Sequence, residues 1–364
     1  MKKKLRVALL FGGKSAEHEI SLISARNIFH AIEKKKYEIL AIAIDRQGRW
    51  FLDDGARLLR DATASSVSMA GAKNAAAVMP GETSKPLMRP SSRQTLGAVD
   101  VVFPVLHGPF GEDGTIQGLL KLAGVPFVGA GVLGSAVGMD KDVMKRLLRD
   151  AQIAIPKFLV FERREQSTIS FGKTKKALGM PLFVKPANLG SSVGISKVTH
   201  KSEFAGAIGK AFRYDDKIIV EEGIRGREIE CSVLGNEKPI ASLPGEIIVQ
   251  HDFYSYDAKY LDDQGARLEI PARLPQAIVK RIQKIAVQAY RALCCEGMAR
   301  VDFFLRPNGQ VLVNEINTIP GFTKISMYPK MWQASGLSYP RLIDRLIGLA
   351  LERSRKEKRR RSSK

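Results

Sequence analysis

The sequence predicts a multidomain α/β protein, and three observations support this prediction. The chain of 364 residues exceeds what one ordinary core accommodates, so two or three domains are expected. Up to residue 128, strands alternate with helices, which predicts a parallel sheet. A new unit begins near Gly138, and it leads to a predicted hairpin at 297–321.

The first strand, turn and helix form an arrangement that is typical of anion or substrate binding. Residues 7–11 predict a buried strand, 12–15 (GGKS) a turn, and 16–31 a helix. Unpaired amides at the start of such a helix face a ligand. Glu17 lies in the first helical turn, where a carboxylate also serves simply to complement the helix dipole. Residues 37–45 predict the next strand.

A second ligand-facing loop follows the strand predicted at 99–106. The segment HGPFGEDG at 107–114 carries three glycines, a histidine and two acids at the carboxyl end of that strand. His107 is a candidate binding residue, although a single histidine is more often structural. The preceding segment, 57–97, lacks a sustained period, and we interpret it as variable surface. A helix at 116–123 and a short strand at 125–128 complete this unit.

The second unit contains a strand that ends in a lysine and is followed by a glycine- and serine-rich loop. Lys185 lies near the end of the strand 180–186, and GSSVGI follows at 190–195. Such a loop can lay amides and hydroxyls against phosphates. It is not a Walker loop, and a glycine turn in a hairpin would look alike. The other predicted elements are helices at 142–150 and 204–212 and strands at 156–161, 218–222 and 228–234.

The last unit combines an aromatic and polar loop with a helix and the hairpin. Residues 253–260 (FYSYDAKY) make a poor core strand and predict a lid, which would exclude water from a reactive intermediate. Residues 275–294 predict an amphipathic helix. Residues 246–248 belong to the segment just before the lid. Helices at 329–336 and 339–351 close the fold.

The hairpin predicts a cation site. If residues 307–310 form its loop, Arg306 pairs with Val311, and counting outward places Asp302 opposite Glu315. Glu315 and Asn317 share a face, so three oxygen-bearing side chains converge. Hard cations that serve phosphates use one or two carboxylates, an amide oxygen and open positions. The alternative is a solvated polar face, and the hairpin alone leaves the two readings equally open.

Composition and charge indicate a soluble enzyme for anionic substrates. The chain is 45% hydrophobic and 26% charged, and no apolar run approaches the ~20 residues of a membrane span. The basic start, residues 1–4, leads straight into a buried strand rather than a signal peptide. The three cysteines show no metal spacing and argue against a disulfide framework, which favours the cytosol.

The net charge of +21 includes a basic tail at 353–364, with eight basic residues and one acidic residue. Such a tail can bind nucleic acid or an anionic surface. Because no aromatic residue interrupts it, we favour a solvated, disordered end without specific nucleic-acid binding. The positive charge of the remaining chain fits an enzyme that binds nucleotides.

Seven segments in order resemble the D-alanine–D-alanine ligases of the ATP-grasp superfamily. They are GGKSAEHEISL, LHGPFGEDG, MDK, FVKPANLGSSVGI, YSYDAKY, RVDFF and NEINTIPGF, and the resemblance extends from Val7 to about Leu351. It implies the ATP-grasp fold, in which a parallel α/β substrate domain precedes two α+β subdomains that grip ATP. We place these at 1–138, 139–229 and 230–352, followed by the tail at 353–364.

The resemblance also implies site residues. For catalysis these are Glu17, Ser191, Tyr260, Arg300 and Ser326, with Glu17, Ser191 and Tyr260 joined by hydrogen bonds. The substrate would contact His107, Lys259 and Gly321. ATP would contact Lys141, Lys185, Ser192, Glu221, Ile224 and Glu228. Two Mg²⁺ (or Mn²⁺) ions would be held by Asp302, Glu315 and Asn317, with Glu315 bridging them.

The implied reaction joins two D-alanines for peptidoglycan precursors. A D-alanine carboxylate attacks ATP to give an acyl phosphate, and the amine of a second D-alanine displaces phosphate. Lys259-Tyr260 in the lid favours a dipeptide, whereas a histidine there would favour D-lactate. A D-lactate or D-serine acceptor is the alternative on the same scaffold, and a nucleic-acid-binding protein is the weakest alternative. The family further implies a cytoplasmic homodimer joined through the N-terminal domain.

Overall fold

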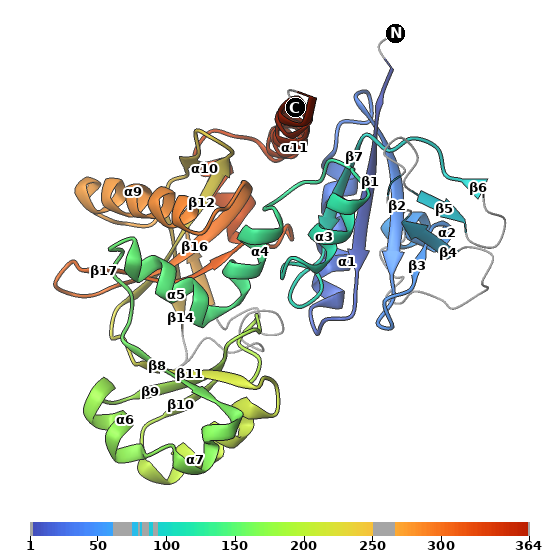
Figure 1. Cartoon of the computed structure of the whole chain (residues 1–364). Helices are drawn as coiled ribbons and strands as arrows, with labels where there is room; N and C mark the ends of the chain where they lie inside the picture. Colours follow the sequence, from blue (N-terminus) through green and yellow to red (C-terminus); the bar gives the residue numbers. More distant parts are fainter. Residues whose placement is uncertain are drawn as a thin grey trace.

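The structure is a computed structural model that describes residues 3–60, 75–78, 81, 87–89, 94–249 and 266–362. The chain forms three lobes, with the N-terminal lobe on one side, the central lobe below and the C-terminal lobe opposite the first (Figure 1). None of the helices in the described part of the chain has the combined length and apolarity that crossing a bilayer requires. The aromatic segment 253–260 lies outside the described residues.

The N-terminal lobe contains the predicted parallel sheet. Strand β1 (Leu5–Gly12) lies between β2 (Tyr37–Ile44) and β7 (Val101–Val105), and both pairings are parallel. Helices α1 (His18–Ala31) and α3 (Thr115–Leu122) belong to this lobe. The strand predicted at 125–128 is reduced to a single bridge between Val102 and Phe127. β1 and β7 are buried and apolar, as strands covered on both faces must be.

Short antiparallel strands extend this sheet within the segment interpreted as variable surface. The order along the sheet is β6-β5-β4-β3-β2-β1-β7. The additional elements are β3 (Trp50–Phe51), α2 (Asp53–Arg60), β4 (Ala75–Val78), β5 (Leu87–Arg89) and β6 (Gln94–Thr95). They lie at the far edge of the lobe, away from the other two (Figure 1).

The central lobe is an antiparallel sheet with helices on one face. Its order is β10-β9-β11-β8, and helices α6 and α7 contribute to its core. The elements are β8 (Phe158–Glu162), the 3-10 helix η2 (Arg163–Thr168), α6 (Phe171–Leu178), β9 (Leu182–Pro186), β10 (Ser196–Val198), α7 (Lys201–Phe212) and β11 (Lys217–Glu222). The glycine- and serine-rich loop joins β9 to β10, so it connects two adjacent antiparallel strands.

The C-terminal lobe contains a larger antiparallel sheet in the order β15-β14-β12-β16-β17, with β13 paired to β12. The strands are β12 (Arg227–Gly235), β13 (Ile240–Ala241), β14 (Gly245–Val249), β15 (Ala266–Glu269), β16 (Gly297–Leu305) and β17 (Val311–Asn317). Helices α9 (Gln276–Ala292) and α10 (Met327–Ala334) accompany it. Cys231 and Cys295 are buried in this lobe, and all three cysteines are free.

Two helices before the central lobe belong to the C-terminal core, which corrects the predicted boundary at residue 139. Helix α4 (Val132–Met139) was not predicted, and α5 (Lys141–Asp150) follows it directly. Met144 and Leu148 of α5 are fully buried in the same cluster as β16, β17 and α9. The compact central lobe therefore begins at β8. The boundary predicted at 229 likewise falls inside β12, whose strand belongs to the C-terminal sheet.

The hairpin forms as predicted at its outer end but not at its turn. Asp302 pairs with Glu315, as expected, whereas Leu305 rather than Arg306 pairs with Val311. The difference arises because Asn314 is an extra residue in a β-bulge between the pairs Phe303–Val313 and Asp302–Glu315. Val311, Val313 and Ile316 enter the core. The bulge therefore lets Val313 face the core while Glu315 still lies opposite Asp302.

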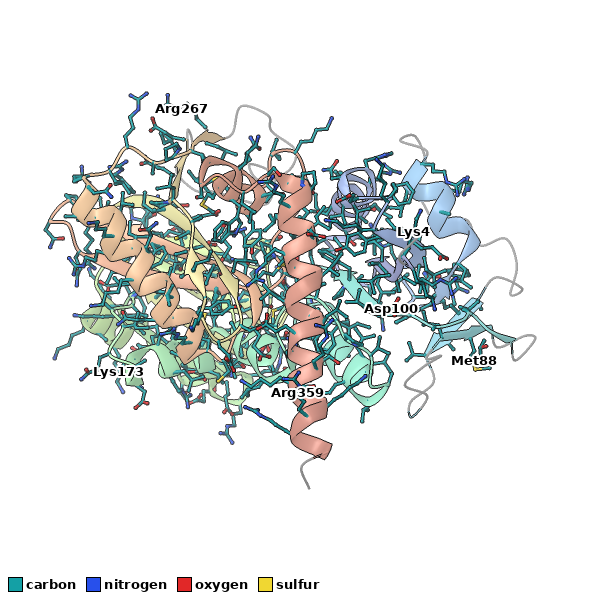
Figure 2. The ribbon with its side chains drawn as sticks, turned by 90° about the horizontal axis from the view of Figure 1, so that it is seen from above. Lys4, Met88, Asp100, Lys173, Arg267 and Arg359 are labelled. Carbon is teal, nitrogen blue, oxygen red and sulfur yellow. The ribbon has the colours of Figure 1, made fainter. Side chains whose placement is uncertain are left out.

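The last helix corrects the prediction of a disordered tail. Helix α11 (Tyr339–Ser362) continues through residues 353–362 and packs against elements of both the N-terminal and C-terminal lobes. In a view from above, α11 runs between the two halves of the molecule, with Arg359 near its end (Figure 2). Arg353 is buried and donates to the carbonyl oxygens of Phe127 and Gly129, at 2.7 Å each. These contacts anchor the start of the tail, whose composition predicted a solvated end.

Candidate active site

The open face of the C-terminal hairpin carries the charged cluster that the sequence predicted. Arg300 and Asp302 of β16 are two residues apart and form a bidentate pair, with both nitrogen–oxygen distances at 2.7 Å. The Asn317 amide of β17 donates to Asp302 at 2.9 Å. Glu230 of β12 lies 2.9 Å from Arg300. The structure thus brings together Arg300, Asp302 and Asn317, and it adds Glu230, which was not predicted.

The electrostatics of Arg300 follow from this cluster. Burial by itself would lower the pKa of Arg300, but the carboxylates of Asp302 and Glu230 raise it well above its usual range. The guanidinium is therefore a permanent positive charge on the face of the hairpin. A partly buried, fixed cation of this kind is suited to stabilise negative charge that develops on a substrate.

The donor set on this face fits a divalent cation that also binds phosphate. Asp302 and Glu315 lie opposite one another, and Asn317 is on the same face. Among the described residues, there is no group of three or more His, Cys, Asp or Glu side chains that could bind a metal ion by themselves. Two carboxylates and one amide oxygen leave positions for water and phosphate oxygens, which is how Mg²⁺ is usually held.

A buried triad of two lysines and a glutamate lies where the central lobe meets α5. Glu221 of β11 contacts Lys185 of β9 at 2.5 Å and Lys145 of α5 at 2.6 Å. Burial alone would raise the pKa of Glu221, but the two ammonium groups lower it to about 2. Burial lowers the pKa of Lys145, whereas Glu221 outweighs burial at Lys185 and raises its pKa. Lys145 also donates to the Asn314 carbonyl at 3.1 Å.

Lys141 and the glycine- and serine-rich loop are held close together. Lys141 is the first residue of α5, and its ammonium donates to the Leu189 carbonyl just before the loop. Burial lowers the pKa of Lys141. Ser191 and Ser192 both adopt positive φ, 50° and 59°, a conformation uncommon for residues with a side chain. Such strained, consecutive positions are typical of functional loops.

The loop also reaches the N-terminal lobe. The Ser191 hydroxyl donates to the Glu17 carboxylate at the start of α1. An added Cβ at Gly190 would lie 3.3 Å from Glu17 Oε2, so the loop backbone passes close to this carboxylate. Of the predicted trio, the structure joins Glu17 and Ser191. Tyr260 and its neighbour Lys259 lie outside the described residues.

His107 is buried between the N-terminal lobe and the segment after the hairpin. Its Nδ1 lies 2.9 Å from the Ile319 carbonyl, and its Nε2 lies 3.5 Å from the Ser24 hydroxyl. Because a carbonyl only accepts, Nδ1 carries the proton and Nε2 is the acceptor. Burial lowers the pKa of His107, which favours the neutral ring. His107 therefore couples two lobes at the edge of the site.

Glu112 is a second buried carboxyl near Glu17 that the prediction omitted. Its Oε1 accepts from the Gly108 amide at 3.1 Å. Burial, together with the nearby Glu17 carboxylate, raises the pKa of Glu112 to about 8. The signal was present in the sequence, because Glu112 belongs to the HGPFGEDG segment that already marked a ligand-facing loop.

Gly321 and Ser326 lie together beyond the hairpin. The Ser326 hydroxyl lies 2.8 Å from the Thr323 hydroxyl and accepts from the Thr323 amide at 2.9 Å. A Cβ at Gly321 would approach the Ser326 oxygen to 2.7 Å, so only glycine fits there without displacement. Ser326 also precedes α10 as its N-cap residue. The pair forms a small polar corner where a carboxylate can approach backbone amides.

The remaining predicted nucleotide-binding residues and two residues that the prediction missed lie on or near β11, β12 and α5. Ile224 comes two residues after β11, and Glu228 lies near the start of β12, at the same junction as Glu221. The missed Lys145 lies four residues after Lys141 on one helix face, a spacing visible in the sequence. Glu230, which was also missed, lies two residues after Glu228 on the same face of β12 and opposite Asp302.

Comparison with known families gives matches to both halves of the chain. Residues 6–130 match the family model described as D-ala D-ala ligase N-terminus, and residues 147–348 match D-ala D-ala ligase C-terminus. A curated D-alanine--D-alanine ligase of Shouchella clausii is 52% identical over 361 residues, covering 99% of this chain and 98% of the relative. D-alanine--D-alanine ligase A of Escherichia coli K12 is 53% identical over 352 residues, covering 96% and 97%.

Solved structures agree in fold. The D-alanine-D-alanine ligase from Coxiella burnetii superposes with a TM-score of 0.86 at 43% identity, covering 98% of this chain and 96% of that one. VanG D-Ala:D-Ser ligase from Enterococcus faecalis gives a TM-score of 0.83 at 39% identity, covering 96% and 100%. The ATP-grasp fold predicted from the sequence is confirmed by these likenesses.

Proposed function

The chain belongs to the family of D-alanine--D-alanine ligases, and we propose how its residues carry out the ligation. These ligases are ATP-dependent enzymes of cell wall synthesis. The substrates are D-alanine and ATP, and a divalent metal assists. The observation that supports the assignment of roles is the convergence of Arg300, Asp302 and Asn317 on one open sheet face. Loops from the other two lobes reach the same region through Glu17 and Ser191.

The first chemical step activates a carboxylate. An oxygen of the first D-alanine carboxylate attacks the γ-phosphorus of ATP, the bond to the ADP oxygen breaks, and an acyl phosphate forms. Carboxylate and triphosphate repel each other, so fixed cations must gather them. Lys141 and Lys185 are the residues we assign to the nucleotide phosphates. Their location at the junction of α5 and the central sheet supports this assignment.

The second step forms the peptide bond. The neutral amine of the second D-alanine attacks the acyl carbon, and the carbon–oxygen bond to phosphate then breaks. The proton lost from the amine leaves with the inorganic phosphate. Negative charge develops on the acyl oxygen during this attack. We assign Arg300 to that oxyanion, because its guanidinium is partly buried and held permanently charged between Asp302 and Glu230.

The first D-alanine occupies the side of the site formed by the N-terminal lobe. Glu17 would accept its ammonium group, and His107 would border it as a neutral ring. The Ser191 hydroxyl bound to Glu17 closes this side with the phosphate loop. Tyr260 and Lys259 complete the site from the lid in this proposal, and their roles stay predictions.

The second D-alanine occupies the side formed by the segment after the hairpin. Its carboxylate would bind at Gly321 and Ser326, where a hydroxyl and a glycine backbone lie together. This corner follows the end of β17 closely in the chain, which supports a binding mode in which the second amine would face Arg300.

The nucleotide fits the junction of the central and C-terminal lobes. Ser192 and its neighbours in the loop would contact the phosphates, as their positive φ values suit backbone amides that point at an anion. Glu221 and Ile224 would border the adenine, and Glu228 would hold the ribose hydroxyls. The Lys185–Glu221 ion pair at 2.5 Å supports a position for the nucleotide between the central sheet and α5.

The metal would be Mg²⁺ or Mn²⁺, with two ions held by Asp302, Glu315 and Asn317. When bound, such ions would supply positive charge that offsets the charge of the phosphate oxygens. Arg300 and Asn317 already fix the orientation of the Asp302 carboxylate, which keeps it on the site face. We further propose a cytoplasmic homodimer joined through the N-terminal lobe.

A D-serine acceptor is the second candidate, because the 39% identical VanG structure carries that specificity. The test is phosphate release from Mg·ATP with D-alanine alone, with D-alanine plus D-serine, and with D-alanine plus D-lactate, with products identified by mass. D-alanyl-D-alanine as the main product supports the dipeptide proposal. A mixed product in preference to the dipeptide would move the chain to the alternative, and L-alanine serves as the inactive control.

A further inference from the structure

Two elements assigned to ATP phosphates in the proposed function are joined directly. Lys141 opens α5, and its backbone amide donates to the Ala187 carbonyl at 3.0 Å. Its ammonium donates to the Leu189 carbonyl, immediately before the loop at 190–194. Residues 187–189 therefore connect the start of α5 to the base of the loop. The relative position of these two elements depends on how firmly residues 187–189 are held.

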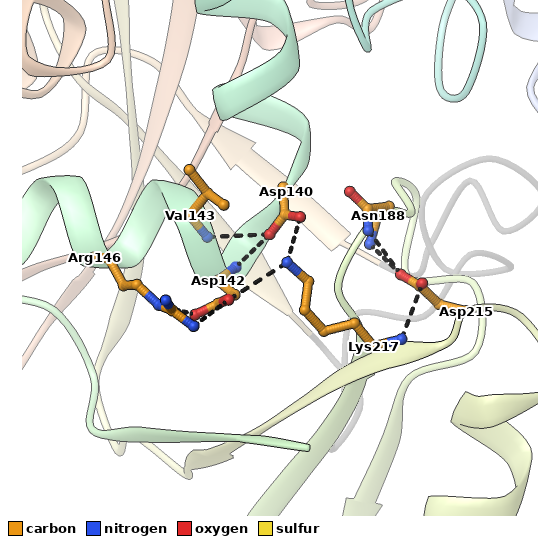
Figure 3. Close-up of polar contacts among 7 residues, drawn as sticks. All are labelled: Asp140, Asp142, Val143, Arg146, Asn188, Asp215 and Lys217. Atoms are coloured by element: carbon orange, nitrogen blue, oxygen red, sulfur yellow. Dashed lines mark hydrogen bonds and ion pairs between the residues drawn. The ribbon is translucent and has the colours of Figure 1, made fainter. Parts of the chain in front are cut away.

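A polar network behind this junction fixes those residues (Figure 3). Asp215 Oδ2 accepts from the Asn188 amide at 2.8 Å and from the Asn188 side chain at 3.0 Å. Asp215 Oδ1 accepts from the Lys217 amide at 3.1 Å, and the Lys217 carbonyl accepts from the Ala187 amide at 3.0 Å. One carboxylate thus holds the loop base against the start of β11.

The same network holds the start of α5. Asp140 is the N-cap residue of α5, and its Oδ1 accepts from the amides of Asp142 and Val143 at 3.0 Å each. Its Oδ2 accepts from the Lys217 ammonium at 2.6 Å, and Asp142 lies 3.4 Å from the same ammonium. Arg146 occupies the Asp142 carboxylate in a bidentate pair, at 2.6 and 2.7 Å. Lys217 therefore spans from the central sheet to the helix that carries Lys141.

We propose that Lys217 and Asp215 are positioning residues that hold the phosphate loop and Lys141 in one frame for ATP. Lys217 acts through Asp140 on the start of α5, and Asp215 acts through Asn188 on the loop base. This inference rests on the proposed roles of Lys141 and the loop. A frame assembled before ATP arrives avoids the cost of ordering these groups during binding.

Electrostatics support the bridge. Partial burial would lower the pKa of Lys217, but hydrogen bonding and attraction to Asp140, together with Asp142, raise it. The ammonium is thus charged throughout the working range of the enzyme. A charge-assisted hydrogen bond at 2.6 Å between partly buried partners is stronger than an exposed ion pair.

The test compares Lys217→Met and Asp215→Asn with Asp216→Asn in the full-length protein. Asp216 adjoins Asp215 in the chain, but its exposed carboxylate pairs with Arg163 instead, at 2.5 Å. We expect both test variants to raise KM for ATP and the Kd of Mg·ADP about tenfold, with KM for D-alanine within about twofold of wild type. Lys217→Arg, which keeps the charge, should recover most of the affinity. Amide exchange of residues 187–194 should accelerate in both test variants.

Other results would overturn the inference. An equal rise of KM for ATP and for D-alanine, or a lower Tm with unchanged nucleotide affinity, would reduce Lys217 and Asp215 to structural residues. Asp215→Asn keeps one acceptor oxygen, so it decides the question if Lys217→Met does not fold. Lys141→Met separates the two proposals. If it abolishes nucleotide binding while Lys217→Met does not weaken it, only this inference fails, whereas unchanged binding in Lys141→Met refutes the proposed ATP site.

Discussion

At the residue scale, the site depends on charged side chains that are buried and matched. Glu221 lies between Lys145 and Lys185, and Arg300 lies between Asp302 and Glu230. A buried charge without its partner costs far more than the intact pair contributes. Substituting one partner of such an ion pair is therefore the most direct test of these contacts.

Glu221→Gln should destabilise the protein by about 3–5 kcal/mol at pH 7, because it leaves two buried ammonium groups without their shared counter-ion. The folded pKa of about 2 lies below the ordinary 4.5, so the carboxylate's stabilisation is present above about pH 4.5 and is lost as pH falls toward 2. Urea unfolding at pH 7 and pH 3 measures this. The difference between variant and wild type should shrink at pH 3, and a constant difference would contradict the ion-triad explanation.

Glu112→Gln should change stability in the opposite pH direction. The folded pKa of about 8 lies above the ordinary 4.5, so the stability associated with this carboxyl is complete below about pH 4.5 and is lost as pH rises toward 8. Glutamine mimics the protonated form, so the variant should gain up to about 4 kcal/mol relative to wild type between pH 5 and 8.5. Urea unfolding across this range provides the measurement, with exposed Glu352→Gln as control. A flat difference would show that Glu112 is ionised in the fold.

Asp302→Asn and Glu315→Gln should each reduce kcat by at least about 10²-fold at ordinary magnesium, because each removes a carboxylate ligand of the proposed metal site. Phosphate release over a magnesium titration is the measurement, and partial recovery at high magnesium would support ligand loss. The exposed variant Asp150→Asn is the control. Near-normal turnover in either test variant would mean that the hairpin does not hold the metal.

At the element scale, sequence patterns predicted most strands and helices but not every boundary. Buried strands such as β1 and β7 are recognisable in the sequence by their apolar runs. Helix α4 was missed because its sequence, VLGSAVGM, is rich in small residues that usually signal loops. The bulge at Asn314 was missed because the pairing of an extra residue depends on the partner strand and on contacts with Lys145.

The site was predicted to the extent that its residues lie in ordered motifs. Glu17 contacts Ser191, and Arg300, Asp302 and Asn317 form a second group. Lys145 and Glu230 were not predicted, because a buried ion partner is recognised only when packing shows which charges are removed from water. Local patterns carry no such information about distant elements.

At the whole-molecule scale, α11 is the element that ties the two ends of the chain together. Arg353 contacts Phe127 and Gly129 of the N-terminal lobe and lies 3.3 Å from Glu296 beside the C-terminal sheet. The basic composition of residues 353–364 suggested a solvated end, since composition alone does not show that one arginine is buried. The two carbonyls that bind it belong to the N-terminal lobe and lie more than 200 residues away in the chain, so no local pattern marks the contact.

Arg353→Met should lower the free energy of unfolding by about 2–4 kcal/mol, because it leaves two buried carbonyls without donors. Arg355→Met, on an exposed position of the same helix, is the matched control and should change stability by less than about 0.5 kcal/mol. Thermal and urea unfolding measure both variants. Equal effects of the two substitutions would show that α11 is held by its general charge rather than by this contact.

The extra residue in β17 has a consequence for a codon-deletion scan of the hairpin. Losing codon 314 would leave Val311, Val313 and Ile316 in alternation with Leu312, Glu315 and Asn317, so the inward and outward sides of the strand would keep their occupants. Losing codon 313 would instead direct Asn314 inward. The codon 314 deletion would, however, take away the carbonyl that Lys145 contacts. The two deletions would thereby separate loss of the Lys145 contact from loss of apolar packing, each through a single missing amino acid.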